Sequence, residues 1–182
     1  MLTLTSGGMG MQTNGRVEIA KPAAEVFGWL VEPAKLTQWA GGPGLMPADP
    51  AALHSGFEAS GAIPALAGDA TMRIENWNPP LGFSVTMTYA GGDATTTYAL
   101  TESGGGTTLT CSSDTDWGTP DLSAMEAQLA QQSPEVQAAM HHAIDLMNSQ
   151  VASGSYDATA QAGMQAALEQ SLAKLKQLAA AA

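Results

Sequence analysis

The chain has 182 residues, of which 13% are charged, and its 6 basic and 17 acidic residues give a net charge of −11. This length fits one domain with a substantial core, and we expect a single domain over residues 1–182. A surface this acidic repels phosphate backbones and anionic lipid headgroups, so neither nucleic acid nor a membrane is an expected partner. The same charge also keeps a protein in solution.

The sequence predicts a cytoplasmic protein. No run of about 18 apolar residues is present, so no membrane span is expected. The first residues, MLTLTSGGMGMQTNG, lack a basic segment followed by an apolar one, so they do not form a signal peptide. Cys111 is the single cysteine and cannot form an internal disulfide. Its place in an alternating segment predicts a small buried residue and not a nucleophile.

The first quarter of the chain predicts one strand and two short helices. Val17 and Ile19 alternate within RVEIA, which is typical of a strand, and the ordered part begins at Met9 or Met11. Pro22 opens a helix, since its missing N–H is harmless at a first helical position. Pro33 ends this helix and starts a shorter one, which runs to Trp39. A long glycine- and proline-rich connection follows, over residues 41–56.

Residues 68–117 predict four strands separated by tight turns. The turns contain Asn78-Pro79-Pro80, Gly91-Gly92 and the triple glycine 104–106. Apolar residues alternate between them: Phe83, Val85, Met87 and Tyr89, then Tyr98 and Leu100, then Leu109 and Cys111. A period of two with such turns predicts an antiparallel meander with one buried face. A curved sheet of this kind has a concave apolar face that another element must cover.

The last third of the chain predicts helices. Apolar residues recur at helical spacing in a first stripe, which Ser133-Pro134 would cap: Val136, Met140, Ile144, Met147 and Val151. A second stripe follows Asp157, a predicted cap: Met164, Leu168, Leu172, Leu175 and Leu178. Polar residues occupy the opposite side of this last helix, which predicts that they face solvent: Gln161, Gln165, Glu169, Lys176 and Gln177.

Four segments in this order resemble one superfamily. They are VEIAKPAAEVFGWLVEPAKLTQW, RIENWNPPLGFSVTM, GGGTTLTCSSDTDW and GMQAALEQSLAKLKQLA. Together they resemble the START-like (SRPBCC) proteins, and more narrowly the bacterial branch related to polyketide cyclases and to the activator of the Hsp-type chaperone ATPase. The resemblance implies an α+β helix-grip fold, in which a curved antiparallel sheet of about six or seven strands wraps a long C-terminal helix. Residues 121–153 exceed the family pattern, and we expect them to add one inserted helix.

Few residues carry recognisable chemistry. His141 and His142 are adjacent and point about 100° apart on a helix, and only His54 remains, so no metal site is expected. Asp114 and Asp116 share one strand face, either as acids of a cleft or as solvated charges. Arg73 and Glu75 also share a face, as a surface pair or, if Arg73 is buried, with Arg73 as an anchor for a ligand carboxylate. The well-marked catalytic motifs are absent, so no catalytic residue and no cofactor are assigned.

The leading interpretation is a cavity between the sheet and the last helix that binds a small apolar molecule. The predicted ligand-binding residues are Phe57, Met72, Ile74, Phe83, Val85, Met87, Tyr89, Tyr98, Leu100, Leu109, Met164 and Leu168, with Leu172 beside them. Trp77, Tyr89 and Tyr98 either place polar groups at one end of the ligand or pack in the core with their polar atoms at its rim. Two alternatives stay open. One is a cyclase- or hydrolase-like enzyme that uses Asp114, Glu75 or His141 as its acid–base residue, and the other is a co-chaperone-like interaction module.

The inserted helix carries a second prediction. One long helix suffices to cover one concave face, so the stripe of the inserted helix must pack elsewhere. We expect it to form a homodimer contact or to cover the mouth of the pocket, with the dimer favoured because two-fold dimers are the commonest oligomers.

Overall fold

The computed structural model describes residues 9–42, 44–63, 68–89, 92–117 and 155–181. The predicted inserted helix, with His141 and His142, lies outside these residues. In chain order the elements are β1 (Met9–Ile19), α1 (Ala23–Val31), α2 (Pro33–Trp39), the 3-10 turn η1 (Pro50–Ala52), β2 (Glu58–Ile63), β3 (Gly68–Asn78), β4 (Gly82–Tyr89), β5 (Gly92–Ser103), β6 (Gly106–Trp117) and α5 (Ser155–Ala181).

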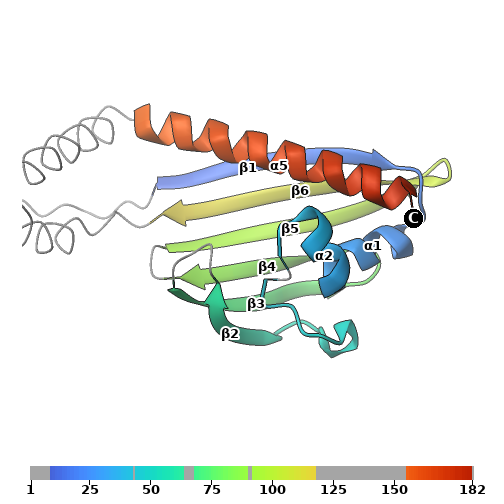
Figure 1. Ribbon diagram of the computed structural model, residues 1–182, viewed down its shortest axis with the longest axis horizontal. Coiled ribbons are helices and arrows are strands. Elements are labelled where there is room, and N and C mark those ends of the chain that lie inside the picture. Colours follow the sequence, from blue (N-terminus) through green and yellow to red (C-terminus); the bar gives the residue numbers. More distant parts are fainter. Residues whose placement is uncertain (1–8, 43, 64–67, 90–91, 118–154, 182) are drawn as a thin grey trace, which may run out of the picture.

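The six strands form one antiparallel sheet in the order β1-β6-β5-β4-β3-β2. The helix α5 runs along β1 on one side of this sheet and also contacts α1 and α2 (Figure 1). We call the side that carries α1 and α5 the inner face, and the opposite side the outer face. A curved sheet with a long C-terminal helix confirms the predicted α+β helix-grip fold.

The first strand is longer than the alternation of Val17 and Ile19 alone indicates. It starts at Met9 and pairs with β6 along its whole length, from Met9 opposite Trp117 to Ile19 opposite Thr107. Met9 is one of the two residues at which the sequence placed this start. The added residues point alternately inward, and Met11 and Thr13 are buried.

Two hydrogen bonds fix α1 against the sheet. The backbone N–H of Ala23, at the start of α1, donates to Oε1 of Glu102 on β5 at 2.7 Å. Thr107 Oγ1 on β6 donates to the carbonyl of Lys21 at 2.7 Å. Because a helix leaves its first N–H groups without partners, a carboxylate at this position stabilises the start of α1. The bonds hold α1 where Phe27 enters the inner face.

A register shift in β3 turns Trp77 inward. The pairing with β4 is irregular between Glu75 and Asn78, and Asn76 has a φ of 51°. Such a bulge adds one residue to a strand and reverses the side on which the next side chain points. The Trp77 ring therefore meets Phe27 and Phe83 at centroid distances of 5.2 Å and 5.5 Å.

A missing side chain lets α5 approach the sheet. A Cβ at Gly15 of β1 would collide with Leu172 and would lie 3.3 Å from Leu168. Leu172 and Leu175 are buried in the core, at 3% and 0% exposure, which agrees with the prediction that the last helix packs through its leucine stripe. Burial of these side chains supplies much of the stability of this layer.

Candidate ligand-binding site

The strand register brings the predicted ligand-binding residues together on the inner face. Residues directly opposite each other on paired strands point to the same side of a sheet. The register pairs Ile74 with Val85, Met72 with Met87, Phe83 with Tyr98 and Leu100 with Leu109, while Gly15 pairs with Cys111 beneath α5 and Cys111 with Tyr98. Alternation along the chain therefore located one continuous surface.

The structure divides this set into two groups. Six residues are buried in the core and support the surface from within: Met72, Ile74, Phe83, Val85, Leu100 and Leu109. The other six keep part of their side chains accessible: Phe57, Met87, Tyr89, Tyr98, Met164 and Leu168. Only the second group has surface left with which to touch a bound molecule. The sequence did not separate the groups, because the separation depends on where α1 inserts.

Aromatic rings fill one end of the inner face. Phe27 of α1 lies edge-on to Phe83 at 5.7 Å, and Trp77 lies beside both. Phe83 is in turn 5.1 Å from the ring of Tyr98. These rings fill the inner face near α1 and extend as far as Tyr98.

Tyr98 occupies a special position in the middle of the sheet. Burial raises the pKa of its hydroxyl well above the usual range, with a smaller contribution from Cys111, so the side chain lies deep in the protein. Part of it is nevertheless accessible, and its hydroxyl has no hydrogen-bond partner among the described residues. Among the described residues no fully buried side-chain polar atom lacks a partner, so this hydroxyl is reached by solvent, and a bound molecule can reach it from the same side.

A row of hydroxyl groups crosses the inner face next to Tyr98. The register aligns Thr13, Ser113 and Thr96, and we call these three the hydroxyl row. The hydroxyls of Thr96 and Ser113 lie 3.1 Å apart and form a hydrogen bond. Our sequence reasoning did not include these residues. The signal was present, since Thr96 is in phase with Tyr98 and Ser113 with Cys111.

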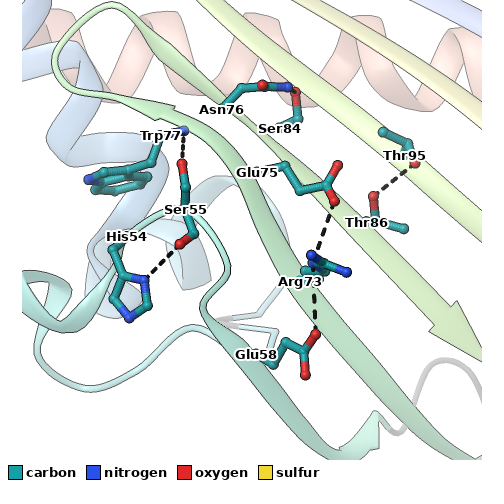
Figure 2. Close-up of polar contacts among 10 residues, drawn as sticks. All are labelled: His54, Ser55, Glu58, Arg73, Glu75, Asn76, Trp77, Ser84, Thr86 and Thr95. Carbon is teal, nitrogen blue, oxygen red and sulfur yellow. Dashed lines mark hydrogen bonds and ion pairs between the residues drawn. The ribbon is translucent and has the colours of Figure 1, made fainter.

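The carboxylates proposed for acid–base chemistry lie on the outer face. Arg73 reaches Glu58 at 3.8 Å and Glu75 at 3.4 Å, and Figure 2 shows the three side chains together on the sheet surface beside the hydroxyl pair of Thr86 and Thr95. More than half of the Arg73 side chain is exposed, so Arg73 is a surface charge and not a buried anchor. The surface-pair interpretation of Arg73 and Glu75 is confirmed.

Two further groups from the sequence also lie away from the inner face. Asp114 accepts a hydrogen bond from Gln12 at 3.2 Å, and Asp114 and Asp116 are both exposed on the outer face. His54 is exposed, and its Nδ1 lies 2.9 Å from the carbonyl of Ser55 (Figure 2). Within the described ranges no three His, Cys, Asp or Glu residues are placed to hold a metal ion.

Cys111 is buried beneath α5, as expected, and burial raises its pKa to about 11. Since the thiolate is the nucleophilic form, this thiol is inert near neutral pH. Tyr89 stands at the far end of the inner face, where burial and the carboxylates of Asp93 and Asp116 raise its pKa.

Two surface hollows lie outside the region around Tyr98. One, of about 400 Å³, is lined by residues of β2, β3 and β4 and reaches Tyr89. The other, of about 440 Å³, lies between the β5–β6 turn and the last turns of α5, with Glu18 and Lys176 on its walls. Both are open, and neither contains the predicted ligand-binding residues as a group.

Comparisons with known proteins identify the fold. No protein-family model and no curated protein matches the chain. Protein MLL2253 from Mesorhizobium loti is similar in structure, with a TM-score of 0.54 at 16% identity over 92% of this chain and 95% of that one. Protein CV1439 from Chromobacterium violaceum gives 0.52 at 16% identity, covering 93% and 96%. Protein BH1534 from Bacillus halodurans gives 0.50 at 15% identity, covering 90% and 95%.

These identities show a shared fold and nothing finer. The fold alone leaves function open, because one fold hosts carriers, enzymes and interaction modules. Among the described helices, none has the length and apolar character needed to cross a membrane. Function must therefore be argued from the inner face itself.

Proposed function

We propose that the protein binds a small, largely apolar molecule on the inner face of the sheet, beneath α5. The observation that carries this proposal is Tyr98, which is deep, partly accessible and without a hydrogen-bond partner among the described residues. Met87 on the same face and Leu168 of α5, which lies over Gly15, keep part of their apolar side chains accessible for such a molecule. The sequence resemblance to the START-like superfamily and its polyketide-cyclase-related branch supports the same use of this surface.

The geometry favours binding over acid–base catalysis. Asp114 and Glu75 both lie on the outer face, where they cannot reach a molecule beneath α5. Among the inward-facing ionisable groups of the described strands, burial keeps the proton on Tyr98 and Cys111, and the carboxylate of Glu102 accepts the N–H of Ala23 at the start of α1. His141 lies outside the described residues.

Within the described residues, the surface gives no support to the interaction-module alternative. Such a module would present a contiguous exposed apolar patch. In the part of the chain that the structure describes, Leu81 is the only large apolar side chain classed as exposed, at 52%. One isolated leucine is ordinary for a protein surface.

Native mass spectrometry of freshly purified protein tests the proposal. We expect a bound small molecule, or saturable uptake of a neutral apolar probe such as 2-ethylnaphthalene. Thr96→Phe, which places a ring on the inner face, should prevent uptake, whereas Thr110→Phe on the exposed outer face should not. Equal loss in both variants, or no uptake by the wild type, would contradict binding at this site.

A homodimer also remains a prediction. Its contact was placed on residues outside the described ranges, and sedimentation of the wild type against Met140→Glu tests it. A monomer in both samples would exclude the dimer.

A further inference from the structure

The arrangement of apolar and hydroxyl side chains on the inner face indicates which kind of molecule can bind there. Gly15, Cys111, Tyr98 and Phe83 form one row across the sheet, which lies under α5 at Gly15 and meets Phe27 of α1 at Phe83. On one side of this row the aromatic rings close the surface, and on the other side runs the hydroxyl row, Thr13, Ser113 and Thr96. On β1, β6 and β5 the surface therefore becomes hydroxyl-bearing next to Tyr98, whereas Val85 and Ile74 continue the same row as apolar residues on β4 and β3.

We infer, resting on the proposed function, that the ligand is an uncharged molecule whose apolar body carries a hydrogen-bond acceptor, such as a carbonyl oxygen, positioned at the hydroxyl of Tyr98. The ring of Tyr98 is held by its neighbour Phe83 at 5.1 Å, so the hydroxyl has a defined direction. Because that hydroxyl lacks a partner among the described residues, an acceptor from the ligand completes its hydrogen bonding.

The protonation state of Tyr98 decides which group it recognises. Since burial raises its pKa, the phenol keeps its proton at every physiological pH and acts as a donor. A donor selects ligands with acceptor oxygens. It gives no advantage to an apolar molecule of the same shape without one, because the hydroxyl would then stay unpaired.

The absence of a counter-charge argues for a neutral ligand. At the described inward-facing strand positions, Glu102 is the only residue with a readily ionised group, and it is engaged by the N–H of Ala23 at 2.7 Å. A buried ligand carboxylate or ammonium group would find no oppositely charged partner at these positions, and burial of an unpaired charge strongly weakens binding. The net charge of −11 further repels anions.

The hydroxyl row gives a second polar contact at a fixed spacing. Thr96 and Tyr98 lie two residues apart on β5 and point to the same side, a separation of about 7 Å along a strand. The bond between Thr96 and Ser113 uses one of their two protons and leaves acceptor capacity free. A second polar group of the ligand, about 7 Å from its acceptor, fits this row.

Three probes of one shape test this inference: 2-acetylnaphthalene, which carries a carbonyl, 2-ethylnaphthalene, which does not, and the charged 2-naphthoate. Titration of the wild type should give about tenfold tighter binding of the acetyl than of the ethyl compound, as for one hydrogen bond to a buried donor. The naphthoate should bind most weakly. Tyr98→Phe should remove the tenfold preference and leave the affinity for the ethyl compound unchanged.

The outcomes separate the two claims. If no probe binds saturably, the proposed function fails. If the acetyl and ethyl compounds bind the wild type equally, or if the preference survives in Tyr98→Phe, the acceptor inference fails while the binding site stands. If Tyr98→Phe does not fold, as judged by its unfolding midpoint, the wild type alone tests the acceptor inference. Tighter binding of the acetyl than of the ethyl compound supports it, and equal binding contradicts it. The outer-face variant Thr110→Val serves as the control and should reproduce the wild-type ratio.

Discussion

The two halves of α5 are attached to the sheet by different forces. In the carboxy-terminal half, residues 169–181, the side chains of Leu172, Leu175 and Ala179 are buried in the core. In the amino-terminal half, residues 155–168, Met164 and Leu168 are only partly buried. This half is attached to the sheet also by hydrogen bonds from Gln161 and Gln165 to the backbone of β1. One end is held by the hydrophobic effect, and the other by polar contacts of modest net value.

The glutamine contacts explain how an edge strand is protected. Gln161 Nε2 donates to the carbonyl of Gln12 at 3.1 Å, and Gln165 Nε2 donates to the carbonyl of Asn14 at 2.8 Å. The N–H of Asn14 in turn donates to Gln165 Oε1 at 3.2 Å. An amide offers both a donor and an acceptor, so Gln165 pairs with β1 as a neighbouring strand would. Edge strands left open invite pairing with other chains.

The largest expected loss of stability comes from the carboxy-terminal half of α5. Leu175→Ala removes a side chain with 0% exposure and should cost about 2–5 kcal/mol of unfolding free energy. Leu168→Ala, in the other half, should cost less than about 2 kcal/mol because that side chain is partly solvated already. Urea unfolding of both variants measures the difference. Equal losses would show that the two halves are anchored alike.

Alkaline pH should lower the unfolding free energy, because burial raises the pKa of Cys111 and of Tyr98. Burial raises the pKa of Cys111 from 9.0 to about 11, so the unfolded chain loses this proton first as the pH rises. The stabilisation is complete below pH 9 and is lost between about pH 9 and 11, by about 2–3 kcal/mol for two pKa units. Tyr98 acts in the same direction, because burial also raises its pKa.

Urea unfolding of the wild type and Cys111→Ala between pH 8 and pH 11 checks this loss. The wild type should lose more stability than the variant, because only the wild type carries the thiol. Parallel curves for the two proteins would mean that the thiol titrates alike in the folded and unfolded chains.

A substitution in the amino-terminal half of α5 should lower the unfolding free energy by less. Gln165→Ala removes two hydrogen bonds to Asn14 and should cost about 1 kcal/mol, since exposed hydrogen bonds contribute little net stability. Hydrogen exchange is the sharper measurement, because the N–H of Asn14 loses its acceptor and should exchange faster. Gln170→Ala, exposed on the same helix, should leave this rate unchanged. An unaltered rate in Gln165→Ala would mean that the amide does not protect β1.

The sequence predicted the leucine stripe of α5 but not the role of its glutamines. Helical spacing places Gln161 and Gln165 opposite the leucine stripe; Gln161 is exposed and Gln165 half-buried, and both amides bond the backbone of β1. Their side chains reach sideways to the edge of β1, whose backbone groups have no strand on that side. A helical pattern separates apolar from polar residues, and it does not show that a polar residue has an edge strand within reach.

A similar limit applies to the inner face. Alternation placed Phe83, Tyr98 and Leu100 on one side of the sheet, as the register confirms. Strict alternation from Ile74 would turn Trp77 outward, but the bulge at Asn76 turns it inward. Patterns of period two follow from the geometry of a strand, whereas a bulge depends on one backbone angle that composition does not reveal.

The smallest expected effect concerns Lys176, in the carboxy-terminal half of α5. Lys176 is exposed and makes no ion pair with any described residue, although Glu18 lines the same hollow. Lys176→Gln should therefore change the unfolding free energy by less than about 0.5 kcal/mol, with Lys174→Gln as the exposed control. A larger loss that vanishes in high salt would reveal an ion pair with Glu18 in solution. The carboxy-terminal half of α5 would then also be attached by a polar contact, and the two halves would differ less in the forces that hold them.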